Sequence, residues 1–356
     1  MVKGILKTSP ISKILISKYS LIAFFLTLLF FFSSFLKAEF YAVATRHHLA
    51  TDIGMKVLEE GGNAIDAAVA VAFALAVVNP SAGNLGGGGF MLLHLAESNE
   101  TFSIDYRERA PTKSFEKMFQ DNSGKVVKGL SLSSILASGV PGTVSGMFYA
   151  AENYGTVKIE NLITPSIQLA KKGFALSDFQ AKNLNKYKKK FSKDKEAKKI
   201  FTRANGFSEG DILVQKNLAS TLERIKRNGV EEFYSGDTAK KIANFFQING
   251  GFLSLTDLNQ YKIRILEPVC GNYRSYEICS MAPPSSGGIA LVQILNILEN
   301  IDLGKLDHNS EEYLKILISV MDYAYRDRAK FLGDPEFFDV PQDLLTSKKY
   351  ADEIYH

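Results

Sequence analysis

The sequence predicts an α+β protein in which buried helices pack against antiparallel strands. Long apolar helical segments are interspersed with pairs of strand-like segments, and short polar turns join the members of each pair. Pairs of this kind form antiparallel hairpins, whereas a doubly wound parallel sheet needs a helix after each strand. The 356 residues are 46% hydrophobic and 22% charged, which is typical of a packed globular protein.

Two helices are predicted in LATDIGMKVLEEGGNAIDAAVAVAFALAVVNP, on either side of two glycines. Gly61 suits the end of the first helix, where the chain commonly turns left-handed. Asn63 suits the cap of the second helix, because its side chain can accept from free backbone amides. The second helix, residues 64–78, is apolar on nearly every side, with Asp66 as its only charge. We therefore expect it to be buried.

A hairpin should follow, because two strand-like runs at residues 90–95 and 101–107 flank a polar turn. Pro141 and Gly155 then bracket a further helix, at the positions where proline and glycine favour helix ends. Apolar residues recur every three or four positions between residues 160 and 250, which indicates mainly helical structure. Further helices are expected at residues 289–298 and 311–329.

The first 38 residues are predicted to be a secretory signal peptide. An apolar run at residues 21–36 precedes Ala38, after which we expect cleavage, and follows four positive charges: Lys3, Lys7, Lys13 and Lys18. The run is shorter than the ~20 residues that a spanning helix needs, although an uncleaved membrane anchor stays open as the alternative. Residues 39–356 would form the working protein, in the periplasm or secreted.

The charge balance argues against nucleic acid as a partner. The net charge is +4, which is small for this length, and a dedicated nucleic-acid binder shows a strong basic excess. The most basic segment is KYKKKFSKDKEAKK, residues 186–199. Its lysines and aromatic residues could contact a nucleic acid or an anionic membrane, but its acidic residues favour a solvated helical face.

The two cysteines, Cys270 and Cys279, fall in a predicted hairpin with Arg274 and Ser275 at its turn. Counting outwards from the turn places them opposite each other in a non-hydrogen-bonded pair, with Cα atoms about 4.5 Å apart. That distance is at the short end of what a disulfide accepts. A disulfide and two free buried thiols therefore both stay open, and an oxidising compartment would favour the disulfide.

The run NPSAGNLGGGGF, residues 79–90, does not have the features of a phosphate-binding loop. No lysine follows the glycines, as a Walker-type loop requires, and the order helix, glycines, strand reverses the dinucleotide fingerprint. We interpret the glycines as structural, because a backbone without side chains allows a sharp turn and close packing. Substitution of Gly87 or Gly88 should therefore impair folding before it alters substrate preference.

Other catalytic motifs are missing from the sequence. No G-x-S-x-G elbow occurs, because GTVSG at residues 142–146 has the wrong spacing. The histidines suggest neither a triad nor a metal site, and they lie at positions 47, 48, 94, 308 and 356. No cofactor and no metal is expected.

IDYRERAP, residues 104–111, contains the best candidate for substrate binding. Side chains alternate along a strand, so Asp105 and Arg107 should share one face. The planar guanidinium of Arg107 could bind a carboxylate through two parallel hydrogen bonds. The alternative is an ordinary surface ion pair among Asp105, Arg107, Glu108 and Arg109.

Taken together, four segments resemble the large-subunit half of a bacterial γ-glutamyltranspeptidase, in the order and at the spacings of that family. The resemblance extends from about Ala42 to the end of the chain. The segments are LEEGGNAIDAAVAVAFALAVVNPSAGNLGGGGFMLLHL, IDYRERAP, GVPGTVSGM and MAPPSSGGIALVQILNILE.

The resemblance implies an N-terminal-nucleophile hydrolase type αββα sandwich, with two antiparallel sheets face to face and helices outside. Such enzymes cut their own precursor and expose a threonine whose hydroxyl attacks and whose α-amine acts as base. The substrate is glutathione or another γ-glutamyl compound, whose γ-glutamyl group passes to water or an amino acid while backbone amides stabilise the oxyanion. Arg107 matches the family arginine that binds the substrate α-carboxylate.

The chain departs from the family at its end. The threonine segment of the family would lie beyond His356, and no Thr-Thr-His tripeptide occurs, so no catalytic residue is expected within the chain. Thr346 lies in an ordinary polar turn and cannot substitute for it. We therefore expect the chain alone to be inactive, poorly soluble and dependent on a small subunit. It could be an interrupted gene product, a partial sequence or half of a two-chain enzyme, and an inactive envelope protein or a non-catalytic γ-glutamyl binder is the alternative.

Overall fold

The computed structural model describes residues 41–356, so the predicted signal peptide lies outside the described part of the chain. Residues Ala44–His356 form one compact unit, and the description below concerns that unit. No helix within the described residues has both the length and the apolar character needed to cross a membrane.

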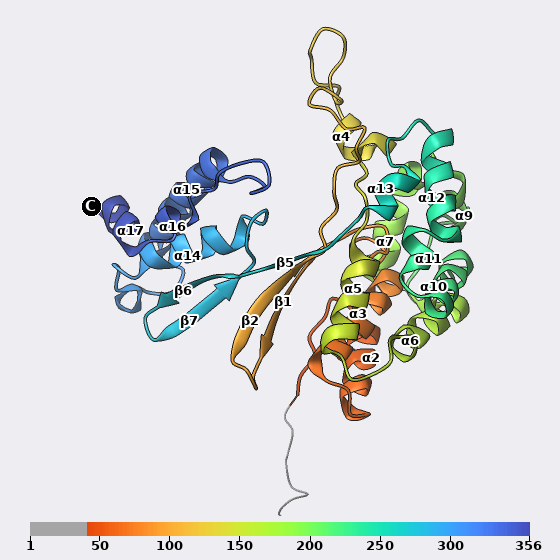
Figure 1. The fold of residues 1–356 in the computed structure, drawn as a ribbon, viewed down its shortest axis with the longest axis horizontal. Helices are drawn as coiled ribbons and strands as arrows, with labels where there is room; N and C mark the ends of the chain where they lie inside the picture. Colours follow the sequence, from red (N-terminus) through yellow and green to blue (C-terminus); the bar gives the residue numbers. More distant parts are fainter. Residues whose placement is uncertain (1–40) are drawn as a thin grey trace, which may run out of the picture. The chain divides into compact units, whose positions relative to one another are not determined.

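The predicted pair of helices is confirmed. Helix α2 spans His48–Glu59 and helix α3 spans Ala64–Val78, with Gly61 left-handed between them at a φ of +92°. Asn63 caps α3 by accepting from two backbone amides, while the buried carboxylate of Asp66 accepts from the Asn63 amide at 2.9 Å. Helix α3 packs against α2, α5 (Thr143–Tyr154) and α6 (Ile159–Lys172), as Figure 1 shows.

Three antiparallel strands form the central sheet, in the order β1-β2-β5. Their bounds are Phe90–Leu95, Glu100–Asp105 and Arg264–Leu266. The second strand ends two residues before the predicted end at residue 107. The reason is local: the Arg107 amide donates to the carboxylate of Asp105 at 2.9 Å instead of continuing the ladder. The expectation that Asp105 and Arg107 share one face of a strand is therefore wrong, because Arg107 lies in the loop after β2.

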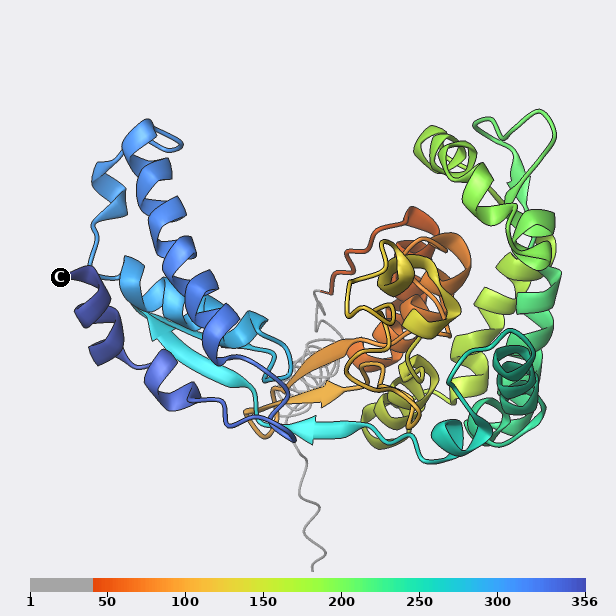
Figure 2. The same ribbon diagram turned by 90° about the horizontal axis from the view of Figure 1, so that it is seen from above.

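The region between residues 160 and 250 is mainly helical, as predicted, and Figure 2 shows the helices of residues 130–260 gathered on one side of the sheet. Two short strands, β3 (Phe174–Ala175) and β4 (Ile212–Leu213), pair with each other. The helices, besides α5 and α6, are α4 (Leu130–Ser133), α7 (Asp178–Lys186), α8 (Lys188–Phe191), α9 (Lys195–Phe201), α10 (Lys216–Asn228), α11 (Glu231–Tyr234), α12 (Asp237–Ile248) and α13 (Leu255–Asn259).

The last part of the chain contains a hairpin covered by helices. Strands β6 (Val269–Tyr273) and β7 (Tyr276–Ser280) pair, and α14 packs on both. A small core of Val269, Ala282, Ile289, Val292 and Leu345 holds this part together. Its helices are α14 (Gly287–Leu298), α15 (Glu311–Phe331), α16 (Gln342–Leu345) and α17 (Lys348–Tyr355).

The register of this hairpin places Cys270 opposite Cys279, as predicted, with a Cα–Cα distance of 4.1 Å. The two sulfur atoms lie within bonding distance, at 2.09 Å. Because the strand register places the two cysteines opposite each other, we predict that the purified protein shows no free thiol in denaturant and two after reduction. Thiol titration before and after reduction checks this, and two free thiols before reduction would contradict it.

Glu232 on α11 is a buried carboxylate that should stabilise the helical part. It is 4% exposed and accepts hydrogen bonds from Arg224 at 2.9 Å, Thr238 at 2.8 Å and Asn228 at 3.0 Å. Burial acts to raise its pKa, but the hydrogen bonds from Asn228, Thr238 and Arg224 outweigh it and lower the pKa from 4.5 to about 2.

Replacing Glu232 by glutamine should therefore lower the free energy of unfolding by about 2 kcal/mol at neutral pH. A carboxylate whose pKa is lower in the folded state than in the unfolded state stabilises the protein at pH values above its unfolded-state pKa. This stabilisation is lost as the pH falls through the folded-state pKa. The difference between wild type and Glu232→Gln should thus hold at pH 5–7 and shrink between pH 4.5 and 2. Denaturant titrations at several pH values measure it, and a difference independent of pH would refute the assignment.

Candidate active site around Arg107

The predicted substrate ligand, Arg107, lies in the loop that follows β2, with its side chain exposed. Its backbone is held at both ends. The amide donates to the carboxylate of Asp105 at 2.9 Å, and the carbonyl accepts from the hydroxyl of Tyr261 at 2.9 Å. The guanidinium carbon lies 5.8 Å from the centre of the Phe90 ring. The loop backbone is thus fixed, while the charged end of the side chain faces solvent.

Arg107 does not form the local ion pair that was the alternative to substrate binding. Asp105 pairs with Arg264 at 2.6 Å, and Arg109 pairs with Glu336 at 3.0 Å. Among residues 41–356, no carboxylate lies within 4.0 Å of the Arg107 guanidinium. Asp105 and Arg109 have other partners, and the Glu108 carboxylate is not within 4.0 Å, so this guanidinium is available to an external carboxylate.

Arg264, at the start of β5, organises this region, and the sequence reasoning missed it. Its guanidinium binds three carboxylates: Asp105 at 2.6 Å, Asp334 at 3.0 Å and Glu336 at 3.0 Å. Burial acts to lower the pKa of Arg264, but hydrogen bonds to Asp334 and Asp105 raise it above the ordinary value. The residue therefore stays charged and joins β2 to the loop after α15.

Glycines bring the backbone of this loop close to its neighbours. A Cβ atom on Gly88 would lie 2.5 Å from the Tyr106 carbonyl oxygen and 2.7 Å from the Glu108 amide. On Gly142 it would lie 2.0 Å from the same carbonyl oxygen. The carbonyl of Gly87 also accepts from the first amides of α5, including that of Gly142 at 2.8 Å. These contacts support the structural interpretation of the glycine run.

Two partly buried tyrosines, Tyr106 and Tyr261, also support the loop. Burial raises the pKa of Tyr106 to about 12, and burial is also the main cause of the raised pKa of Tyr261. Both therefore remain protonated at neutral pH. Tyr261 stacks on Tyr234 with ring centres 5.6 Å apart, which orients its hydroxyl as the donor to the Arg107 carbonyl.

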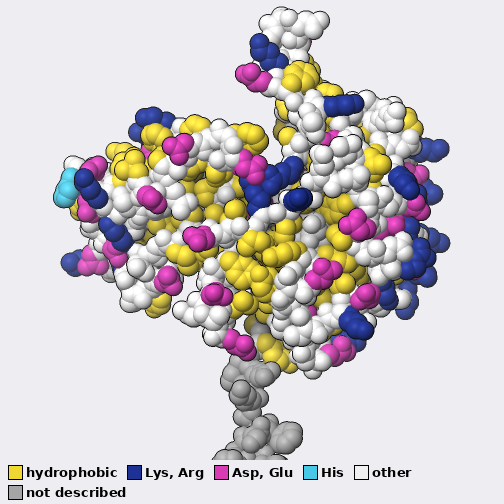
Figure 3. All heavy atoms as spheres, in the orientation of Figure 1, with side chains coloured by type: hydrophobic (Ala, Val, Ile, Leu, Met, Phe, Trp, Pro, Cys, Tyr) yellow, Lys and Arg dark blue, Asp and Glu magenta, His cyan; other side chains and the backbone are white. Residues whose placement is uncertain are grey.

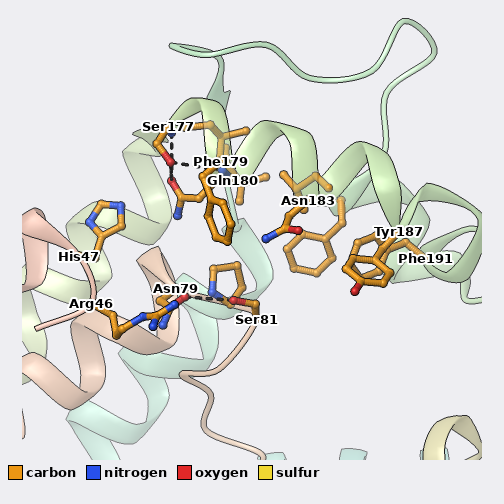
Figure 4. Close-up of a pocket in the computed structure, with 15 residues that line it drawn as sticks. Arg46, His47, Asn79, Ser81, Ser177, Phe179, Gln180, Asn183, Tyr187 and Phe191 are labelled. Carbon is orange, nitrogen blue, oxygen red and sulfur yellow. Dashed lines mark hydrogen bonds between the residues drawn. The ribbon is translucent and has the colours of Figure 1, made fainter. Parts of the chain in front are cut away.

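A cavity of about 220 Å³ adjoins this loop. Its lining residues are Arg109, Ala110, Thr112, Val140, Asp257, Gln260, Tyr261 and Lys262. A second cavity, of about 210 Å³, contains none of the predicted site residues. It is lined by α7, by His47 and by aromatic side chains, as Figure 4 shows. Arg107 lines neither cavity, although the first includes Tyr261, whose hydroxyl donates to the Arg107 carbonyl. The candidate site therefore rests on the chemistry of Arg107 and not on the shape of a cavity.

One group of side chains in residues 41–356 has the spacing of metal ligands, namely Cys270, Glu277 and Cys279. The sulfur atoms of its two cysteines lie within bonding distance of each other, so they cannot both act as thiolate ligands. His47 and His48 are neighbours with stacked rings 4.7 Å apart. Burial lowers the pKa of His47, and the adjacent His48 lowers it further.

Comparisons with known proteins agree on one family. Residues 50–356 match the family described as Gamma-glutamyltranspeptidase. The chain is 47% identical over 314 residues to the glutathione hydrolase proenzyme of Escherichia coli (strain K12), covering 88% of this chain and 54% of that protein. The chain thus spans about half the length of the curated relatives that it matches.

Solved structures give the same result. The crystal structure of Helicobacter pylori gamma-glutamyltranspeptidase has a TM-score of 0.87 at 47% identity, covering 90% of this chain and 92% of that chain. The gamma-glutamyltranspeptidase of Pseudomonas nitroreducens complexed with L-DON has a TM-score of 0.85 at 36% identity, covering 90% of this chain and 94% of that one. The predicted N-terminal-nucleophile hydrolase type of fold is confirmed.

Proposed function

The chain belongs to the gamma-glutamyltranspeptidase family, and from this premise we propose that it recognises the donor substrate for a γ-glutamyltransferase and glutathione hydrolase. The observation that carries the proposal is the guanidinium of Arg107. It is exposed, it has no carboxylate partner within the described residues, and it projects from a loop whose backbone is fixed at both ends.

In this proposal Arg107 holds the α-carboxylate of glutathione or a related γ-glutamyl compound. An arginine–carboxylate pair is bidentate and charge-assisted, so it fixes both the position and the orientation of the donor. A donor held by its α-carboxylate places its γ-carbonyl at a defined distance from the arginine. A nucleophile fixed at that position reacts faster, because the two reacting groups are already held in the correct geometry. The family resemblance implies a threonine for that role, supplied by a small subunit together with the oxyanion donors.

The reaction would proceed in two steps. The threonine hydroxyl attacks the γ-carbonyl and the amine of the donor leaves, which gives a γ-glutamyl ester on the enzyme. Water then releases glutamate, or the amine of an amino acid takes the γ-glutamyl group. Arg107 neither donates nor accepts a proton in either step. It holds the α-carboxylate, and so keeps the γ-glutamyl group in place, through both steps.

Co-expression tests whether this chain supplies the donor-binding residue and a small subunit supplies the nucleophile. We would produce the chain with the C-terminal half of the Escherichia coli glutathione hydrolase and measure aniline release from a γ-glutamyl anilide. The combination should turn over substrate, and each half alone should match the blank. Turnover by the purified chain alone would contradict the proposal, as would a soluble monomer that melts cooperatively without its partner.

Calorimetry with glutathione separates an enzyme half from a non-catalytic binder. Binding by the native chain that Arg107→Ala abolishes, without turnover in the co-expressed pair, would favour a binder. Absence of both binding and turnover would favour an inactive envelope protein.

We also propose that the protein works outside the cytoplasm, on the basis of the signal-like segment at residues 1–38. Fractionation and the mass of the exported protein check this proposal. A start after Ala38 would fit it, whereas an intact N-terminus in the membrane fraction would favour the anchor.

A further inference from the structure

The basic segment of residues 186–199 has a charge that the proposed activity does not use. It contains eight lysines and two acidic residues, a net charge of +6, whereas the whole chain has a net charge of +4. The segment comprises the end of α7, helix α8 and most of α9. Figure 3 shows Lys and Arg side chains along the right-hand margin, over the helical part of the chain where Figure 1 labels α9, α10 and α12.

The lysines of this segment are not neutralised by the protein. Within residues 41–356, none of the eight has a carboxylate within 4.0 Å, whereas Lys315 elsewhere pairs with Glu311. The two acidic residues of the segment are engaged locally. Asp194 accepts from the Ala197 amide at 2.7 Å to cap α9, and Glu196 accepts from Asn217 at 3.1 Å. The positive charge is therefore presented to solvent.

Aromatic side chains attach the segment to the fold. Tyr187, Phe191 and Phe201 line the cavity of about 210 Å³ in Figure 4, and the last two rings lie 5.3 Å apart. Tyr187 is 39% exposed, with the ammonium groups of Lys186 and Lys190 at 5.5 and 5.4 Å from its ring centre. Phe191 and Phe201 pack against the core, whereas Tyr187 and most of the lysines are exposed, an arrangement suited to an apolar–polar boundary.

We propose that this lysine segment docks the protein on the surface of an anionic lipid bilayer. Each lysine near such a surface contributes about 1 kcal/mol of attraction, and exposed aromatic rings such as Tyr187 and Phe179 suit the interfacial zone. A single-stranded nucleic acid fits less well, because binding it relies on rings free to stack on bases. Here Phe191 and Phe201 pack against the hydrophobic core instead. The proposal does not depend on the activity proposed above.

Sedimentation with vesicles tests the proposal, using exported protein whose N-terminus is identical in all samples. Vesicles of phosphatidylcholine with 30% phosphatidylglycerol are compared with pure phosphatidylcholine. The variant is Lys189→Gln/Lys193→Gln/Lys198→Gln, which removes three exposed charges of the segment. The control is Lys305→Gln/Lys315→Gln/Lys349→Gln, which changes the net charge equally at lysines that already pair with acidic side chains.

Wild type and control should bind the anionic vesicles with equal affinity, and the segment variant should bind about 100-fold more weakly, as expected from the loss of three lysine contributions. Raising the salt concentration should lower the affinity of the wild type for anionic vesicles until it approaches that of the segment variant. Equal binding to both vesicle types, equal loss in control and variant, or no binding at low salt would each overturn the proposal. Tighter binding to a DNA duplex than to the anionic vesicles would also overturn it.

Discussion

Arg107→Ala should lower kcat/KM for a γ-glutamyl anilide by about 100- to 1000-fold in the co-expressed two-part enzyme. The substitution removes a bidentate, charge-assisted pair, and a loss of about 3–4 kcal/mol corresponds to that factor. Its melting temperature should stay close to that of wild type, because Phe90 is the main side-chain contact of the guanidinium. Steady-state kinetics and thermal unfolding measure the two effects separately.

A substrate without the carboxylate sharpens this prediction. The 4-aminobutyryl anilide keeps the amine and the scissile amide but lacks the α-carboxylate, so wild type and Arg107→Ala should turn it over at similar, low rates. Arg107→Lys should fall between them, because lysine keeps the charge and loses the planar bidentate geometry. Arg109→Ala is the neighbouring control, since Arg109 pairs with Glu336. An equal loss at both arginines would show that local charge, and not Arg107 itself, matters.

Gly88→Ala should reduce the free energy of unfolding by about 3 kcal/mol, the upper part of the range for overpacking. Its added Cβ would meet the Tyr106 carbonyl oxygen at 2.5 Å and the Glu108 amide at 2.7 Å. Both are backbone atoms of the loop that holds Arg107, so neither can move aside without displacing the loop. Denaturant unfolding followed by circular dichroism measures the loss.

Two neighbouring glycines provide matched controls. At Gly86 the nearest atom to an added Cβ is 3.8 Å away, so Gly86→Ala should be almost neutral. At Gly87 the close contact is the side chain of Asn84 at 2.6 Å, which can rotate away, so the cost should be intermediate. An equal effect at Gly86 and Gly88 would indicate that loss of chain flexibility, and not the close backbone approach, causes the destabilisation.

Local signals were enough to predict the elements that surround the site. The second helix was predicted at residues 64–78 and the first strand at 90–95, and both have those bounds in the structure. Asn63, Gly61 and the alternating strand residues act through neighbours in sequence, which pattern analysis can detect. The same holds for the pairing of Cys270 with Cys279 across a two-residue turn.

Long-range pairing accounts for what the sequence did not reveal. Arg264 lies opposite Asp105 in the sheet, although 159 residues separate them along the chain. No periodicity in the sequence indicates which carboxylate an arginine meets at such a separation. The shift of Arg107 from strand to loop is by contrast a local effect, because one oxygen of Asp105 accepts from the Arg107 amide while the other binds Arg264.

The way in which the loop is held has an evolutionary consequence. Tyr261, Asp105 and the glycines all contact main-chain atoms of residues 106–108, and none of them needs the side chain at position 107. The scaffold therefore tolerates other side chains there, and under the role proposed for Arg107 one codon would alter which acyl donor is accepted while the architecture persists. Selectivity at this position can drift or be engineered without a compensating change elsewhere, whereas the glycines should remain under strong purifying selection.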